Sequence, residues 1–115
     1  MSTTAAIASV LLAAIMVVAA ARKFTHRAGV VAEYARVGVP EDRLNHLALI
    51  LLAGAAGLLV GLAWPPLGVA AAAGTVVYFL LAVAAHARHG DTANIAVPVA
   101  IELLALATLT LQALS

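Results

Sequence analysis

The chain contains no cysteine and few charged or aromatic residues. None of its 115 residues is a cysteine, which excludes disulfides, thiolate metal ligands and CxxC redox chemistry by this chain itself. Charged residues make up 10% and aromatic residues 4% of the sequence, whereas soluble domains average about 25% charged residues. We therefore expect neither a water-soluble core nor a nucleic-acid interface, which would need a basic stripe interleaved with aromatic side chains.

Most residues of the chain are apolar, and these residues fall into four stretches. The chain is 65% hydrophobic with a mean hydropathy of +1.12. Each stretch has about 17–21 residues, and about 20 apolar residues cross a hydrocarbon core of ~30 Å. The expected spans cover about residues 5–21, 44–63, 65–85 and 95–114. The sequence predicts an all-α fold: one domain, residues 1–115, forming a transmembrane four-helix up-down bundle.

The basic residues predict the orientation of these spans. Five of them lie between the first and second stretches, and Arg88 lies between the third and fourth. In a four-pass chain both loops lie on one side, which the positive-inside rule places in the cytoplasm of a bacterial inner membrane. Both termini and the Trp64-Pro65-Pro66 turn then face outward. Four arginines are expected to contact lipid headgroups: Arg22, Arg27, Arg43 and Arg88.

The N-terminal stretch is expected to remain a span rather than to be cleaved as a signal peptide. No positive charge precedes it, and the basic pair Arg22-Lys23 follows it, which is the reverse of a signal-peptide pattern.

The polar region after this stretch contains one helical pattern. Val30, Val31, Tyr34 and Val37 recur at helical spacing, which predicts a short amphipathic cytoplasmic helix between the first two spans. This helix is expected either to lie along the membrane surface or to cover the inner mouth of the bundle. The Gly38-Val39-Pro40 segment is expected to end it.

The second span carries three glycines, Gly54, Gly57 and Gly61, the last two in a GxxxG pattern. Small residues at this spacing allow helix backbones to approach closely in lipid. We interpret them as packing residues within the chain; the alternative is a homo-oligomer interface.

Glu102 is the one acidic residue inside the four stretches. A carboxylate in a span costs about 2.5–3.5 kcal/mol on insertion scales and is a functional-site hypothesis by default. Tyr78 lies at nearly the same depth, and a hydrogen bond from its hydroxyl to Glu102 would reduce the cost of burying the carboxyl. The alternative is that the desolvated carboxyl stays protonated. Lys23 and His86 belong to the cytoplasmic mouth of the bundle. The ligand-binding hypothesis therefore names Glu102, Tyr78, Lys23 and His86; the structural alternative makes Glu102 a contact between helices or with a partner subunit.

Histidines cluster near the third loop, but we expect no metal site there. His86 and His89 share a helix face and Asp91 follows them, but no further ligand is placed by the sequence. We also assign no catalytic residues, because no nucleophile has a base placed beside it.

Several motifs in this order resemble the DoxX-like family of small membrane proteins. They are Ala20-Ala21-Arg22-Lys23-Phe24, Val37-Gly38-Val39-Pro40, Gly54 in the second span, and the run from His86 to Asp91. The resemblance implies a four-helix bundle with its basic loops inward. It also implies an association with membrane-bound oxidoreductases, such as thiosulfate:quinone oxidoreductase. The family pattern leads us to look for an acidic residue near Gly54, where this chain has Leu51, Leu52 and Ala53.

Three functional hypotheses follow. The first is a membrane accessory subunit without catalysis of its own, whose partners are membrane lipids and other membrane protein subunits. The second is a quinone- or lipid-binding component of a membrane oxidoreductase system, with quinone as the ligand suggested. The third is a small transporter, although the outer half of the spans offers few polar residues for a pathway: Thr75, Thr108, Thr110 and Gln112.

Overall fold

The computed structural model describes all 115 residues, and all of its regular secondary structure is helical. Four long helices form the bundle: α1 (Thr3–Phe24), α3 (Leu44–Val60), α4 (Pro65–Arg88) and α5 (Ala96–Ala113). A short helix, α2 (Ala28–Ala35), follows α1, and two single 3-10 turns, η1 (Glu41–Arg43) and η2 (Thr92–Asn94), precede α3 and α5. The predicted all-α fold with a short helix between the first two spans is confirmed.

Each long helix is long and apolar enough to cross a membrane, with η1 extending the second span to Glu41–Val60. At 1.5 Å per residue, about 20 residues cover the ~30 Å hydrocarbon core. The protein is therefore a multi-pass membrane protein. The second span, α3, ends at Val60, before the predicted limit of 63, because the chain turns at Gly61. Helix α4 continues past the predicted limit of 85 to Arg88.

Local chemistry accounts for the helix ends. The Ser2 hydroxyl accepts a hydrogen bond from the Ala5 amide and caps α1. Pro65 and Pro66 occupy the first turn of α4, where a missing N–H is tolerated. Gly38 has a φ of +80°, and a Cβ there would lie 2.8 Å from His89 Nε2. The loop after α2 therefore needs glycine both for its left-handed backbone and for its contact with the end of α4.

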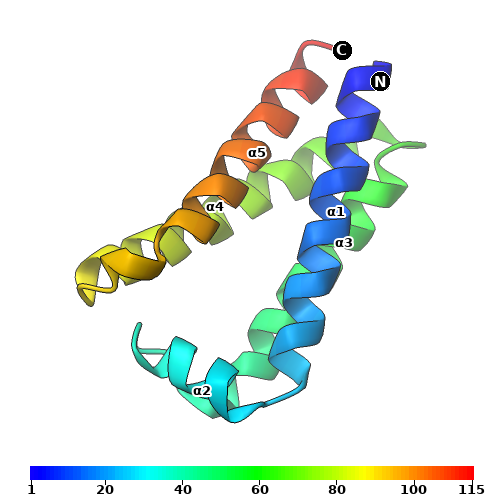
Figure 1. Cartoon of the computed structure of the whole chain (residues 1–115). Helices are drawn as coiled ribbons and strands as arrows, with labels where there is room; N and C mark the ends of the chain where they lie inside the picture. Colours follow the sequence, from blue (N-terminus) through cyan, green and yellow to red (C-terminus); the bar gives the residue numbers. More distant parts are fainter.

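The four spans form a ring in which each helix contacts the next: α1 with α3, α3 with α4, α4 with α5, and α5 with α1. Figure 1 shows the two termini together at one end of the bundle and α2 at the other. The pair α1/α3 and the pair α4/α5 converge at the terminal end and diverge toward α2, so that the bundle opens as a V. We call the α2 side the basic end, because every Lys and Arg lies there.

Apolar side chains fill the middle of the bundle and polar contacts join the helices at the terminal end. Leu12, Met16 and Leu51 are buried in the core. Toward the termini, Gln112 Nε2 of α5 donates to Ser9 Oγ of α1 at 3.1 Å. This convergence at one end leaves space between the helix pairs at the basic end.

Candidate functional site

A cavity of about 400 Å³ lies at the basic end, inside the V. Side chains from α1, α2, α4, α5 and the segment before α5 line it. Its polar and charged lining residues are Arg22, Lys23, Glu33, Tyr34, Arg36, Tyr78, His86 and Asn94. Phe79, Pro98 and Ile101 are among its apolar lining residues. The cavity thus joins a charged mouth to an apolar interior.

Lys23 is the most deeply buried charged residue of this cavity. It lies in the last turn of α1, and only 3% of it is exposed. Its ammonium lies 4.6 Å from the centroid of the Tyr34 ring, within cation–π range. No carboxylate lies within ion-pair distance of Lys23.

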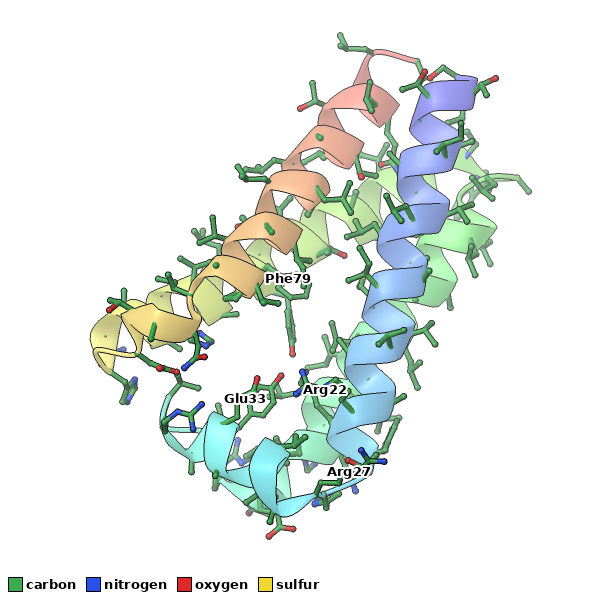
Figure 2. All side chains as sticks on the ribbon, viewed as in Figure 1. Arg22, Arg27, Glu33 and Phe79 are labelled. Carbon is green, nitrogen blue, oxygen red and sulfur yellow. The ribbon has the colours of Figure 1, made fainter.

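The neighbouring Arg22 does have a carboxylate partner. Arg22 Nη2 lies 2.9 Å from Glu33 Oε2, a contact that ties α1 to α2. Figure 2 shows these two side chains facing each other between the helices, with Arg27 at the outer corner of the loop. The arginine is 52% exposed and the glutamate 34%, so the pair positions α2 more than it stabilises the fold.

Tyr34 and Tyr78 enter the cavity from different helices. Burial raises the pKa of the Tyr34 phenol, the nearby Glu33 carboxylate raises it further, and Arg22 opposes the shift. Tyr78 packs edge-to-face against Phe79, with ring centroids 5.0 Å apart. Both tyrosines also line a second cavity of about 180 Å³ beside Val37 and Leu47. Tyr34 therefore stays neutral at physiological pH, and its hydroxyl can donate or accept a hydrogen bond.

His86 and Asp91 close the α4 side of the mouth. His86 Nδ1 donates to the Ala82 carbonyl at 2.8 Å. The other ring nitrogen, Nε2, faces Asp91 Oδ2 at a distance of 3.8 Å. Arg36 Nε lies 3.7 Å from the same oxygen, which is buried without a hydrogen-bond partner. These long contacts connect the loop after α2 to the end of α4.

Glu102 is placed differently from the other predicted ligand residues. It belongs to the buried face of α5 and is 8% exposed, but it does not line the cavity, although its neighbour Ile101 does. Its Oε1 is buried without a hydrogen-bond partner. The predicted hydrogen bond from Tyr78 is therefore wrong: equal depth on successive helices does not make two side chains point toward each other. Three of the four predicted residues, Lys23, Tyr78 and His86, meet in the cavity.

The predicted headgroup residues lie at the basic end. Arg27, Arg43 and Arg88 are exposed there, outside the cavity lining, whereas Arg22 lies at the cavity mouth. His26, in the α1–α2 loop, has a positive φ of 49°. Its Nε2 lies 2.7 Å from Asn45 Oδ1 and its Nδ1 lies 3.0 Å from Glu41 Oε2. These two hydrogen bonds, to Asn45 first and Glu41 second, raise the pKa of His26.

The three packing glycines face neighbouring helices of the same chain. A Cβ on Gly57 would lie 2.8 Å from the Cβ of Ala71, and one on Gly61 would clash with the backbone of Gly68, both on α4. Gly54 faces Met16 of α1. Between α3 and α4 a groove of about 270 Å³ remains, lined partly by Gly54, Gly57 and Gly74.

The sequence left open whether the short helix lies along the membrane surface or covers the inner mouth of the bundle, and α2 takes the second position. Glu33, Tyr34 and Arg36 were not predicted as site residues, yet all three line the cavity. The available signal was the basic pair at the end of the first span followed closely by an acidic residue and a tyrosine. This spacing allows α2 to fold back under α1.

One of three comparisons with known proteins gave a match. The family model described as the DoxX-like family matches residues 7–108, as the motif order predicted. Neither a curated protein nor a solved structure matches this chain.

Proposed function

The chain belongs to the DoxX-like family, and on this basis we propose that it is a small accessory subunit of a larger membrane complex, without catalysis of its own. The observation that supports this role is the groove between α3 and α4. It lies among the apolar middle turns of both spans and is lined by small residues: Ala53, Gly54, Gly57, Ala71 and Gly74.

Gly74 supports the proposal that another helix packs in this groove. Gly74 is exposed, and nothing lies within 4 Å of the place that its Cβ would take. No contact within this chain therefore requires a glycine, whereas Gly57 and Gly61 are required by α4. Small residues on a lipid-facing helix permit close approach of a second transmembrane helix. We assign the groove to a helix of a partner subunit, and a second copy of this chain is the alternative occupant.

The proposed location is a bacterial inner membrane with the basic end in the cytoplasm. All Lys and Arg residues lie at that end, and cytoplasmic loops carry an excess of these residues. Both termini then lie outside. Cysteine accessibility of a Ser115→Cys variant tests the orientation, since the native chain has no cysteine. Labelling of intact cells by an impermeant thiol reagent is expected; labelling only after cell lysis would reverse the orientation.

A pair of matched substitutions tests the subunit proposal. Ala53 lines the groove, whereas Ala107 is exposed on α5 away from it. The tagged chain is purified from its native host in mild detergent, and co-purifying chains are quantified by mass spectrometry. Ala53→Leu should reduce partner recovery about tenfold, equivalent to about 1.4 kcal/mol, while Ala107→Leu should retain it. Recovery of the native chain alone, or an equal loss in both variants, would contradict the proposal.

A second function, binding of a quinone or similar lipid-like ligand, is favoured by the cavity at the basic end. Its volume of about 400 Å³ lies within the range of about 300–1,000 Å³ typical of small-molecule sites. Tyr78 would contact the ligand, whereas Phe24 is exposed outside the cavity. In nanodiscs containing a short-chain ubiquinone, Tyr78→Leu should reduce quinone retention and Phe24→Leu should not. Equal retention by both variants would exclude this cavity as the quinone site.

A further inference from the structure

Lys23 is a buried residue whose positive charge is paired with no carboxylate of the chain. Only 3% of the residue is exposed, and its ammonium lies over the Tyr34 ring, 4.6 Å from the ring centroid. Its ammonium donates no hydrogen bond to another residue of the chain, although it can donate three. Burying a charge is costly unless it is paired and hydrogen-bonded.

Glu33 and Asp91, the two carboxylates at the α2 and α4 sides of the cavity mouth, are paired with other groups. Glu33 is paired with Arg22 at 2.9 Å, and Asp91 is shared by Arg36 at 3.7 Å and His86 at 3.8 Å. Arg22, Lys23 and Arg36 all line the cavity, against one acidic lining residue, Glu33. The cavity therefore has an excess of positive charge with Lys23 at its buried side.

Beyond this charged region the cavity lining is apolar. Phe79, Ala82, Pro98 and Ile101 line it from α4 and α5. An apolar wall next to an unpaired ammonium is complementary to a molecule that has an anionic head and a hydrocarbon tail. A neutral lipid would leave the ammonium without a counter-charge, and a small inorganic anion would leave the apolar wall unfilled.

We propose that this cavity is a binding site for an anionic amphiphile, whose carboxylate or phosphate head pairs with Lys23 and whose alkyl chain lies along Phe79 and Ile101. Arg22 and Arg36 stand at the same cavity and add the bidentate donors that suit either headgroup. The proposal rests on the lipid-binding function proposed for this cavity but takes an anionic amphiphile as the ligand in place of a neutral quinone. It is independent of the groove between α3 and α4.

Binding of three probes with the same oleoyl chain tests the charge requirement. The probes are oleate, oleoyl-lysophosphatidic acid and the uncharged monoolein, added to the full chain in a non-ionic detergent and followed by native mass spectrometry. At least one anionic probe should bind about tenfold more tightly than monoolein, as expected for a charge-assisted contact. Whether oleate or oleoyl-lysophosphatidic acid binds more tightly shows whether the site prefers a carboxylate or a phosphate head. Equal affinity for all three probes would overturn the proposal and still leave a lipid-binding cavity.

Two variants test the role of Lys23 itself. Lys23→Met keeps a chain of similar length without the charge and should weaken binding of the anionic probe about tenfold. Arg88→Met removes a charge from the same end of the bundle but outside the cavity lining, and should change affinity by less than about twofold. An unchanged affinity in Lys23→Met, or an equal loss in both variants, would overturn the assignment.

A variant that retains Lys23 tests the location of the site. Ile101→Trp adds volume to the apolar wall of the cavity and should displace the anionic probe while the charge remains. Persistence of binding in this variant would show that the amphiphile sits elsewhere. Partner recovery in the native host should be unaffected by Lys23→Met, so the failure of either proposal can be recognised separately.

Discussion

The ammonium of Lys23 lies 4.6 Å from the centre of the Tyr34 ring, although Lys23 belongs to the last turn of α1 and Tyr34 to α2. The contact holds α2 beneath the bundle at the mouth of the cavity. A cation–π contact contributes about 0.5–2 kcal/mol, whereas removing a charge from water costs several kcal/mol. In the absence of a ligand, the contact therefore offsets only part of the cost of burying Lys23.

Lys23→Met is expected to stabilise the ligand-free protein. The substitution removes the unpaired charge and keeps the buried chain length, so the free energy of unfolding should rise by about 1–2 kcal/mol. Thermal unfolding in a non-ionic detergent without added amphiphile measures the change. Tyr34→Leu is the comparison variant and should lower stability, since it removes the ring but leaves the ammonium. A loss of stability in Lys23→Met as large as in Tyr34→Leu would mean that the ammonium is structurally satisfied.

Glu102→Leu should also stabilise the isolated chain. Glu102 is buried on α5 and its Oε1 has no hydrogen-bond partner, and an acidic residue in a span costs about 2.5–3.5 kcal/mol on insertion scales. The expected gain is about 1–3 kcal/mol in the same unfolding assay. Glu102→Gln is the control for shape, because it retains a polar group of similar size. If Glu102→Leu is instead destabilising, the carboxyl has a partner within the folded chain.

Gly61→Ala should disrupt the packing of α3 against α4. The new Cβ would meet the backbone of Gly68, which cannot rotate away as a side chain can. Overpacking of this kind costs about 1–3 kcal/mol. Gly74→Ala is the matched control, because open space surrounds that position, and the isolated chain should lose no stability. Equal effects of the two substitutions would show that α3 and α4 do not approach closely at Gly61.

His26 should titrate above the ordinary histidine value of about 6.5. Both ring nitrogens face oxygen acceptors, Asn45 Oδ1 and Glu41 Oε2, and only the doubly protonated ring can donate to both. Because the folded state raises this pKa, the stabilisation is fully present below the unfolded pKa and is lost as pH rises through the folded one. NMR titration of the His26 ring should show a lower pKa in the Glu41→Gln variant. The same pKa in both proteins would contradict these hydrogen bonds.

The spans and the family could be predicted from the sequence because they depend on composition and local order. A run of about 20 apolar residues must form a helix in lipid, since no water is there to satisfy its backbone groups. The candidate site was only partly predictable. Lys23, Tyr78 and His86 line one cavity, whereas Glu102 does not. Depth along a span follows from residue number, but the direction of a side chain depends on how each helix is rotated against its neighbours.

Composition and order alone determine that this chain crosses the membrane four times and gathers its basic residues at one end. The tertiary structure decides what that basic end encloses. The two helix pairs diverge there, α2 folds back beneath α1, and the pairing of Glu33 with Arg22 leaves Lys23 without a carboxylate. These features depend on the angles between helices and on which of several neighbouring charges meet, and both are set by packing between segments distant in the sequence.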